Sequence, residues 1–292
     1  MTGPERTSRT SGEMAGRVAM VTGANTGIGK AVAVELARRG ARVVMVVRSA
    51  ERGAAALAEV REAGGSDAAA ELLPIDLASL AAVRSGAADF LARHDRLHVL
   101  VNNAGVFSMQ RRTSADGHEL TFAVNQLAPF LLTRLLLPRL TAGAPARIVN
   151  VASHAHYGAR MHWDDLQLER SYPGHGRAAY GQSKLANVLF TRELARRLAG
   201  TGVVTNAVHP GVVATELVRR TPFFVRWGFR FLGLTPEQGA EGPVLLASSP
   251  DLAAVSGRYF NRTREAAPSP AAADPDAAVR LWGLCEQLTG PV

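Results

Sequence analysis

Lysine and cysteine are scarce in this sequence. Its 33 cationic side chains include two lysines, Lys30 and Lys184, and arginine supplies all the others. The single cysteine, Cys285, cannot form a disulfide within the chain. Chains without disulfides are typical of reducing compartments, so we expect a cytoplasmic protein.

Long apolar runs are missing as well. No stretch approaches the roughly 18 consecutive uncharged apolar residues of a membrane-spanning helix, so we expect no transmembrane segment. The first 14 residues are polar and rich in Arg, Ser and Thr, without the apolar core of a secretory signal. We expect residues 1–14 to be a disordered tail.

The formal net charge of +8 raises the question of a nucleic-acid partner. The arginines, however, are spread along Ala-rich helical segments such as "ELARRGARV" and "RELARRLAG", as on solvated helix faces. Neither a basic stripe nor an aromatic platform accompanies them, so we expect no nucleic-acid partner.

Apolar runs rich in Val, Ile and Leu alternate with helical patterns along most of the chain. The expected strands are 17–23, 41–48, 70–77, 97–105, 146–153 and 202–210. The expected helices are 29–40, 50–65, 80–94, 118–140, 178–200 and 278–290. A loop rich in Pro and Ala, 265–278, precedes the last helix. This alternation predicts an α/β domain with a doubly wound parallel sheet over residues 15–262, on which residues 263–292 pack.

The loop "TGANTGIG" joins the first expected strand to the first expected helix. Gly23, Gly27 and Gly29 permit a tight turn and a close approach of the backbone to a ligand. The free N–H groups and positive dipole end of the helix can then bind a pyrophosphate. An ordinary glycine-rich turn is the alternative, but the strand–loop–helix context favours a dinucleotide site.

The end of the second expected strand, "VVRS", indicates which of NAD(H) and NADP(H) is preferred. It contains no acidic residue. NAD-preferring dehydrogenases often place an acid there to bind the ribose 2′-hydroxyl. The guanidinium of Arg48 can instead bind a 2′-phosphate, so we predict NADP(H) over NAD(H). Asp76, after the third strand, can accept from an adenine amino group. In "NNAG" the side-chain amides of Asn102 and Asn103 can bond backbone and hold the strand end open, and Ala104 and Gly105 leave room for a flat ring.

Tyr180 and Lys184 lie four residues apart in "AYGQSKLANVLF", and therefore on one face of an expected helix. A free phenol has a pKa near 10, too high for a base at neutral pH, and a nearby cation lowers it. Lysine suits this position better than arginine, because its compact charge can also bond a ribose hydroxyl. We predict that Tyr180 is an acid/base and that Lys184 lowers its pKa. A surface pair on the helix is the alternative.

Other polar residues follow strands or interrupt apolar segments. Ser153 closes the strand "RIVNVAS", at the edge where α/β ligands bind, and its hydroxyl can donate to a carbonyl oxygen. Asn125 stands inside an apolar helix, where Asn is a poor helix former. It holds a kink, a water or the lysine, or it is a satisfied core amide. After the sixth strand, Pro210 and Gly211 predict a turn, with Thr215 as a helix cap or phosphate ligand.

The motifs TGxxxGIG, NNAG, YxxxK and PGxxxT, with Asn125 and Ser153 between them, occur in an order that resembles the short-chain dehydrogenase/reductase family over residues 15–262. The segments "GANTGIGK", "RIVNVASHAHYG" and "YGQSKLANVLFTRELARRL" are similar to its retinol-dehydrogenase-like branch. The resemblance implies a Rossmann fold and NADP(H)-dependent interconversion of a carbonyl and an alcohol. It also implies a homo-oligomer, because the helix at 178–199 commonly pairs between subunits in this family.

The resemblance further implies roles for a catalytic set. Tyr180 would be the acid/base and Ser153 would polarise the substrate oxygen. Lys184 would bind the ribose, and Asn125 would hold a proton-relay water. The residues expected to bind the cofactor are Gly23, Asn25, Thr26, Gly27, Ile28, Gly29, Arg48, Asp76, Leu77, Asn103, Ala104, Gly105, Tyr180, Lys184, Pro210, Gly211, Val212 and Thr215.

Two segments are expected to shape the substrate side. The insertion 154–178 would form extra wall, as it does in this branch, and its histidines show no metal-ligand spacing. Residues 216–236 contain four phenylalanines and a tryptophan, which suits a lid over a hydrophobic aldehyde or ketone. A dimer contact, plain helix packing or peripheral membrane contact through the flanking arginines are the alternatives.

One functional alternative stays open on the same fold. A non-catalytic protein could bind NADP(H) as a sensor and regulate a partner. The presence of both Tyr180 and Lys184 favours the enzyme. Membrane-anchored retinoid relatives carry an apolar N-terminal segment that this sequence does not show, so we expect a soluble enzyme.

Overall fold

The protein forms one eight-stranded sheet. The computed structural model describes residues 12–212 and 233–292, in which the strand order is β3-β2-β1-β4-β5-β6-β7-β8. All neighbouring strands are parallel except β7 and β8. The chain order reverses between β1 and β4, which is the switch point where doubly wound sheets bind ligands. Thr215 and most of the expected lid at 216–236 lie outside the described residues.

Strands β1, β2, β4, β5 and β6 are almost wholly buried, because their Val, Leu and Ile side chains face helices on both sides of the sheet, whereas the edge strand β3 is only partly buried. The strands are β1 (Val18–Thr22), β2 (Arg42–Val47), β3 (Ala70–Pro74), β4 (Val99–Asn102), β5 (Ala146–Val151), β6 (Val203–His209), β7 (Tyr259–Asn261) and β8 (Arg264–Ala266). All six predicted strands are confirmed, and each is shorter than its apolar run, whose last residues turn into the following loop.

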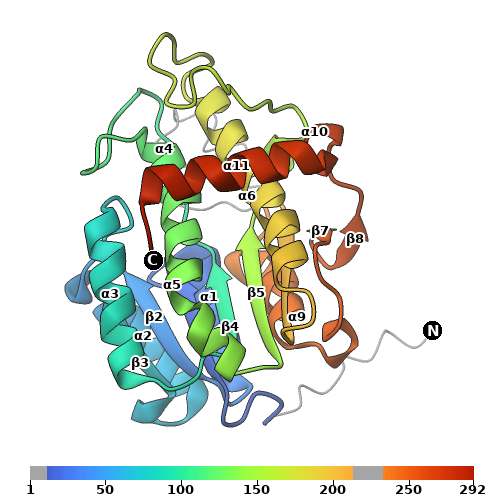
Figure 1. The fold of residues 1–292 in the computed structure, drawn as a ribbon. Coiled ribbons are helices and arrows are strands. Elements are labelled where there is room, and N and C mark those ends of the chain that lie inside the picture. The colour runs from blue at the N-terminus through green and yellow to red at the C-terminus, as the bar shows by residue number, and fades with distance from the viewer. Residues whose placement is uncertain (1–11, 213–232) are drawn as a thin grey trace.

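Two layers of helices cover the sheet (Figure 1). One layer holds α1 (Gly27–Arg38), α2 (Ala50–Gly64) and α9 (Pro236–Ser248). The other layer holds α3 (Leu80–Arg93), α4 (Leu120–Phe122), α5 (Ala128–Ala142) and α6 (Arg177–Arg197), and is followed by α10 (Pro270–Ala273) and α11 (Pro275–Thr289). Each layer has its own apolar core against the sheet. The predicted doubly wound Rossmann fold is confirmed.

Helix ends follow local signals in the sequence. The Ser49 hydroxyl accepts from the Arg52 N–H at the start of α2, and Gly65, with φ of 69°, ends that helix. At α9, Thr235 and Gln238 satisfy each other's backbone N–H groups in a capping box. Such caps fix where each loop begins, and therefore where the loops at the strand ends can reach.

The loop predicted at 265–278 is wrong. Strand β8, helix α10 and the first turn of α11 occupy most of it. Pro270 and Pro275 are the first residues of the two helices, and Ser269 and Asp274 cap them. Proline is favoured at the first helical position, where its missing N–H has no helical partner. The prolines and polar residues that suggested a loop are therefore helix starts.

Both ends of the described chain pack onto the sheet domain. Met14, in the expected tail, is buried, and its backbone N–H donates to the Arg39 carbonyl at 2.9 Å. Ordered packing therefore begins just before the expected boundary at residue 15. At the other end β8 pairs with β7 and α11 packs on α6.

Residues 120–142 form one helical rod with a π turn at Ala123–Leu127. Pro129 stands four residues after Asn125 and has no N–H to bond the Asn125 carbonyl, so the regular hydrogen-bond ladder is broken there. By length and composition alone, this rod is apolar enough to cross a membrane, which the sequence analysis did not expect. Of its apolar window 78% is buried inside the protein, and the core helices of globular proteins pass the same test.

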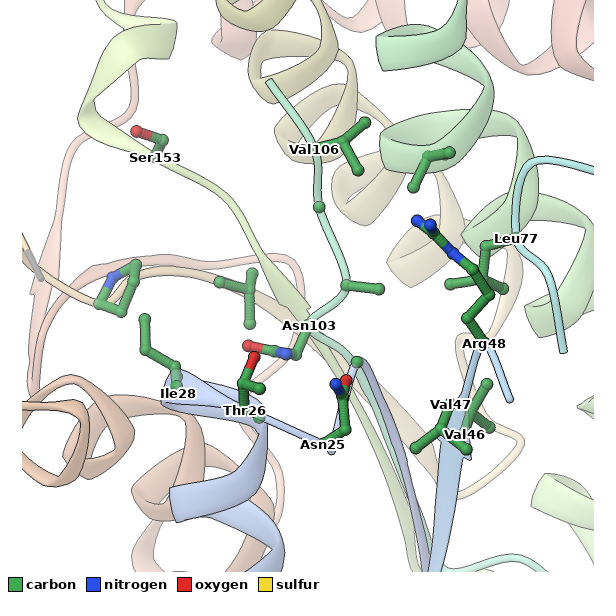
Figure 2. Close-up of a pocket in the computed structure, with 18 of the residues that line it drawn as sticks. Asn25, Thr26, Ile28, Val46, Val47, Arg48, Leu77, Asn103, Val106 and Ser153 are labelled. Carbon is green, nitrogen blue, oxygen red and sulfur yellow. The ribbon is translucent and has the colours of Figure 1, made fainter. Parts of the chain in front are cut away.

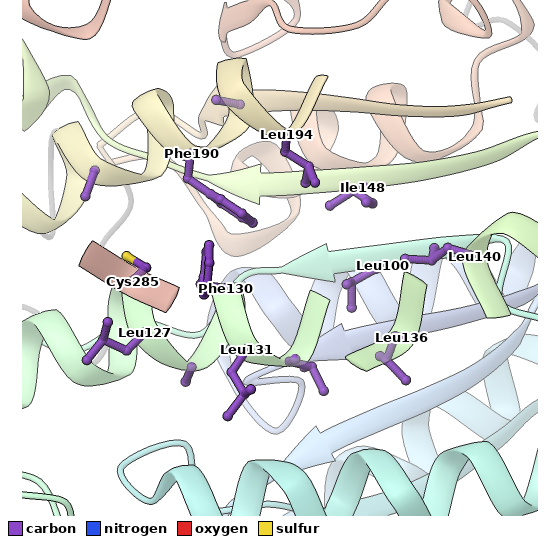
Figure 3. Close-up of a cluster of buried hydrophobic side chains, with 14 of the residues drawn as sticks. Leu100, Leu127, Phe130, Leu131, Leu136, Leu140, Ile148, Phe190, Leu194 and Cys285 are labelled. Atoms are coloured by element: carbon purple, nitrogen blue, oxygen red, sulfur yellow. The ribbon is translucent and has the colours of Figure 1, made fainter. Parts of the chain in front are cut away.

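The C-terminal helix α11 lies across α5 and α6 (Figure 1). Trp282 contacts Phe130 of α5 edge-on, with 5.0 Å between ring centroids, and stacks on Phe190 of α6 at 6.0 Å. Cys285 is fully buried in the same cluster (Figure 3), and burial raises the pKa of its thiol to about 12. The guanidinium of Arg197 lies 4.1 Å from the Trp282 centroid. The chain itself thus covers a face of α6, the helix expected to pair between subunits.

This packing predicts that α11 is a structural part of the domain. Truncation of the buried Trp282 in Trp282→Ala removes three aromatic and cationic contacts, so the free energy of unfolding should fall by about 3–5 kcal/mol. Urea denaturation measures it. The control Val279→Ala changes a half-exposed side chain on the same helix and should alter stability by less than about 0.5 kcal/mol. Equal small effects of both variants would contradict the assignment.

Candidate active site

The loops after the first six strands border a cleft of about 490 Å³. Figure 2 shows Arg48 and Leu77 on one side of this cleft and Ser153 on the other, with Thr26 and Asn103 between them. The predicted site residues that line it are Gly23, Asn25, Thr26, Gly27, Ile28, Gly29, Arg48, Asp76, Leu77, Asn103, Ala104, Gly105, Ser153, Tyr180, Lys184, Pro210, Gly211 and Val212. Asn125 lies behind the cleft wall, and Thr215 lies outside the described residues.

Two glycines of the first loop have steric reasons to be glycine. Gly23 has φ of 67°, and a Cβ there would lie 3.1 Å from the Cα of Ala104. A Cβ on Gly29 would collide with the Gly23 carbonyl and the Asn103 amide. The start of α1 can therefore press against the loop after β4. Thr26, the N-cap of α1, uses no side-chain atom to cap the helix. These features form a cradle that fits a pyrophosphate.

Thr22, which the sequence analysis did not single out, ties β1 to the "NNAG" loop. Its hydroxyl oxygen accepts from the backbone N–H groups of Asn103 and Ala104, each at 3.0 Å. The Asn103 side chain donates in return to the Thr22 carbonyl at 2.9 Å. Asn103 thus holds two strand ends in fixed register, as predicted for an amide bonding to backbone at this strand end. The same prediction is wrong for Asn102, whose amide donates to the side chains of Thr133 and Asn150. The signal that could have found Thr22 is a hydroxyl at the last position of an otherwise apolar strand.

Cationic side chains gather at the end of the cleft near β2. Arg48, directly after β2, and Arg52, in the first turn of α2, both line it, and neither forms an ion pair within the described part of the chain. Asp76 uses one carboxylate oxygen to accept the Ala78 N–H at 3.0 Å. Arg52 was missed because one more arginine on an Ala-rich helix carries no distinctive signal. The pair gives this end of the cleft a positive charge suited to an anionic group.

Tyr180 and Ser153 meet at the opposite end of the cleft. Tyr180 lies in the first turn of α6 and Ser153 directly after β5, and their hydroxyls share a hydrogen bond. Burial raises the pKa of Tyr180 above its ordinary value, and the bond with Ser153 opposes this. Phe107 contacts the Tyr180 ring edge-on at 5.7 Å. A phenol with a raised pKa stays protonated at neutral pH and can donate a proton.

Lys184 is buried below Tyr180, with its Nζ 5.8 Å from the centre of the phenol ring. Its ammonium donates to the Val151 carbonyl at 2.7 Å and to Asn187 Oδ1 at 3.2 Å. Burial lowers the pKa of Lys184 to about 8. The expected lowering of the Tyr180 pKa by Lys184 is not found, because the ammonium is turned toward these two oxygens and burial dominates the phenol.

Asn125 is a fully bonded core amide at the π turn. Its Oδ1 accepts from the Val106 N–H at 2.7 Å, and its Nδ2 donates to the Val106 carbonyl at 3.0 Å and to Ser183 Oγ at 2.9 Å. The side chain therefore pins the loop after β4 to the middle of α6. Among the alternatives, the satisfied amide and the distorted helix both hold, and none of its hydrogen bonds in the described structure is to Lys184.

The insertion 154–178 contributes no residue to the cleft within the described part of the chain. It packs instead on α6, where Gln182 accepts from the His162 N–H at 2.8 Å and donates to the Leu166 carbonyl at 2.9 Å. The extra wall on the substrate side that the sequence analysis expected from this insertion stays a prediction. Across residues 12–212 and 233–292, no group of three or more His, Cys, Asp or Glu side chains could hold a metal ion.

His209, the last residue of β6, also lines the cleft and was missed by the sequence analysis. Its side chain is buried, with Nδ1 bonded to nothing in the described structure. Burial, followed by the nearby His154, His156 and Lys184, lowers its pKa to about 4. The sequence placed a histidine before the Pro–Gly turn but gave no sign that it would be buried and neutral.

This burial predicts acid-sensitive stability. The folded-state pKa of His209 lies below the unfolded value of about 6.5, so the unfolded chain binds more protons between these values. The stabilising contribution is complete above pH 6.5 and is lost as the pH falls toward 4, by about 2 kcal/mol at pH 5.

Urea denaturation at pH 7 and pH 5 tests this for wild type and His209→Asn. The variant should lose less stability between the two pH values than the wild-type protein. The control His118→Asn replaces a histidine outside the cleft, in the loop after β4, and should keep the wild-type dependence. An unchanged pH dependence in His209→Asn would contradict the assignment.

Comparison with known proteins agrees with this architecture. The sequence model of the short chain dehydrogenase family matches residues 17–164 and 168–222. Retinol dehydrogenase 13 from Homo sapiens is 44% identical over 296 residues, which cover 94% of this chain and 85% of that protein.

Solved structures show the same fold. A crystal structure of a protein from Mycobacterium Paratuberculosis aligns with a TM-score of 0.76 at 36% identity and covers 94% of both chains. A metagenomic short-chain oxidoreductase, solved in complex with NADP, aligns with a TM-score of 0.63 at 31% identity and covers 82% of this chain and 94% of its own. The chain thus belongs to the short-chain dehydrogenase/reductase family, in its retinol-dehydrogenase-like branch, and is an oxidoreductase of carbonyl and alcohol groups.

Proposed function

We propose that the protein is an NADP(H)-dependent reductase of a hydrophobic aldehyde or ketone, and that Tyr180 is its proton donor. The observation that carries the proposal is the Ser153–Tyr180 hydroxyl pair at one end of a cleft whose other end carries Arg48 and Arg52. A dinucleotide bound along this cleft would have its nicotinamide near the hydroxyls and its adenosine near the arginines.

The residues of the cleft fit such a cofactor. The glycines at 23 and 29 leave room for a pyrophosphate. At Gly105 there is open space as well: a Cβ built there would have Asn125 Oδ1, at 3.5 Å, as its nearest neighbour. The nicotinamide ring, when bound, supplies the hydride. Lys184 lines the cleft with one ammonium N–H that neither Val151 nor Asn187 uses, and this N–H can bond a ribose hydroxyl.

The proton side of the reaction belongs to this chain's own groups. The Ser153 hydroxyl bonds the substrate oxygen and polarises its carbonyl. The Tyr180 hydroxyl then donates its proton to that oxygen as negative charge develops there. Because burial raises the pKa of Tyr180, the phenol is protonated at neutral pH and holds the proton that reduction of a carbonyl requires.

The preference for NADP(H) rests on the charge at the end of β2. Arg48 and Arg52 both line the cleft, and the end of β2 offers no carboxylate for a ribose 2′-hydroxyl. Two guanidinium groups at this end of the cleft can bind a 2′-phosphate through charge-assisted hydrogen bonds. The NADP complex of the metagenomic relative supports this choice of cofactor.

Two observations support a hydrophobic substrate. The chain is similar to a retinol dehydrogenase, and the segment 216–236, which is expected to form a lid, is rich in aromatic residues. We further propose a cytoplasmic enzyme. A homo-oligomer, as the resemblance implies, would have to pair through a surface other than the part of α6 covered by α11. The non-catalytic sensor remains the second candidate, and the presence of the hydroxyl pair favours the enzyme over it.

The acid/base role is tested with Tyr180→Phe, which keeps the ring and removes the proton donor. NADPH oxidation with a panel of hydrophobic aldehydes and ketones, retinal included, should fall at least about 100-fold in kcat. Fluorescence should show that NADPH binding is kept. The control Tyr172→Phe changes a tyrosine outside the cleft and should retain turnover. Wild type that binds NADPH and turns over no compound would support the sensor instead.

The cofactor preference is tested with Arg48→Ala. Loss of a charge-assisted contact to the 2′-phosphate should raise KM for NADPH by about 10-fold or more, while KM for NADH changes little. The control Arg38→Ala removes an exposed arginine of α1 that pairs with Glu35. It should leave both KM values unchanged. Parallel changes for NADPH and NADH in Arg48→Ala would refute a 2′-phosphate contact.

A further inference from the structure

The ammonium group of Lys184 is held without a carboxylate. Its side chain is 4% exposed, and none of the described ion pairs includes it. Its two hydrogen-bond acceptors are the Val151 carbonyl, at the end of β5, and Oδ1 of Asn187. Val151 offers a backbone oxygen that no mutation of its side chain would remove. Asn187 is therefore the side chain on which the position and charge of the ammonium depend.

Asn187 has only one orientation that satisfies its neighbours. Its Nδ2 donates to the Asn125 carbonyl at 2.7 Å and to Gln126 Oε1 at 3.0 Å. Both partners are acceptors, so an exchange of the amide oxygen and nitrogen would bring oxygen against oxygen. The same exchange would turn the NH₂ group toward the Lys184 ammonium. The Asn187 oxygen must therefore face Lys184.

The Asn125 carbonyl, which accepts this bond, lacks its usual helical donor. In a regular helix it would accept from the N–H of the residue four positions later, which is Pro129 and has none. The π turn at Ala123–Leu127 accommodates the proline. A buried carbonyl without a donor is costly, and the Asn187 amide satisfies it. The proline in one helix thus fixes an amide in another.

We propose that Asn187 is the positioning residue of the active site: a fixed amide that links the freed carbonyl at the π turn to the Lys184 ammonium, stabilises the charged form of Lys184 and directs its remaining N–H into the cleft. The proposal deepens the proposed function, because Lys184 is the group expected to bind the cofactor ribose. It nevertheless concerns a property of the chain alone, which can be measured without cofactor or substrate.

The scarcity of lysine makes that measurement direct. Protein labelled with ¹³C at the lysine Cε carries only two signals, from Lys30 and Lys184. Lys30 pairs with Glu59 at the surface, with a third of its side chain exposed, and serves as an internal reference. The Lys30→Arg variant assigns the two signals, and the chemical shift followed against pH gives the pKa of each lysine in the full-length chain.

Asn187→Leu keeps the approximate volume and removes the amide. The pKa of Lys184 should fall below its wild-type value by about one pH unit, because a charge-assisted hydrogen bond is lost. Asn187→Asp keeps an oxygen near the ammonium and adds a negative charge, so the pKa should rise above the wild-type value. The Lys30 signal should titrate as before in both variants. If Asn187→Leu does not fold, the rise in Asn187→Asp alone decides the question.

Thr191→Val is the matched control. Thr191 is equally buried on α6, one turn further along, and its hydroxyl bonds the backbone carbonyl of Asn187 rather than its side chain. This variant should lower the free energy of unfolding while the Lys184 titration stays in place. An unchanged Lys184 pKa in both Asn187 variants would overturn the proposal. An equal fall in Thr191→Val would overturn it too, since that would reflect general loosening of α6.

The consequence for the enzyme is tested separately. The pH above which NADPH-dependent turnover declines should move down in Asn187→Leu together with the Lys184 titration, by a similar interval. If the turnover profile stayed fixed while the titration moved, Asn187 would still set the charge of Lys184. That result would count against the proposed role of Lys184 in binding the cofactor ribose.

Discussion

Parallel pairing is the constraint on which the site depends. Because β1 to β6 all run in the same direction, their carboxyl ends meet along one edge of the sheet, and every loop that lines the cleft leaves from that edge. The bonds between Thr22 and Asn103 then fix two of these ends against each other. Glycines at 23 and 29 let the first helix press close to this tie. Cofactor contacts and reacting groups therefore share one rigid frame.

The buried polar groups behind the cleft are linked to one another by hydrogen bonds. Asn125, Asn187 and Lys184 are buried where the π turn packs on α6 behind the cleft, and an unsatisfied polar atom is costly there. Each is satisfied by another: the Asn125 side chain holds the loop after β4, its carbonyl holds Asn187, and Asn187 holds the ammonium. A chain of this kind turns a broken helix into a support for the site, because no member can move without leaving another unpaired.

Much of this could be read from the sequence. Continuous Val, Ile and Leu runs between helical patterns specified the parallel sheet, because such strands must be covered on both faces. The loop "TGANTGIG" and the tyrosine–lysine spacing marked the two ends of the cleft, since both are local patterns with a local geometric meaning. The prediction of a loop around the prolines at 270 and 275 was wrong. A proline at the first position of a helix cannot be told from a proline within a loop until the capping residue before it is recognised.

The sequence by itself determined the order of the helices and strands and the residue types at the strand ends. Hydrophobic periodicity, helix caps and turns all depend on neighbours along the chain. Only the tertiary structure decided the states of the site's ionisable groups. Burial raises the pKa of Tyr180 and lowers those of Lys184 and His209. The partnership of Asn187 with a carbonyl 62 residues away was likewise invisible. Such effects depend on which distant segments exclude water from a side chain, and no local pattern records that.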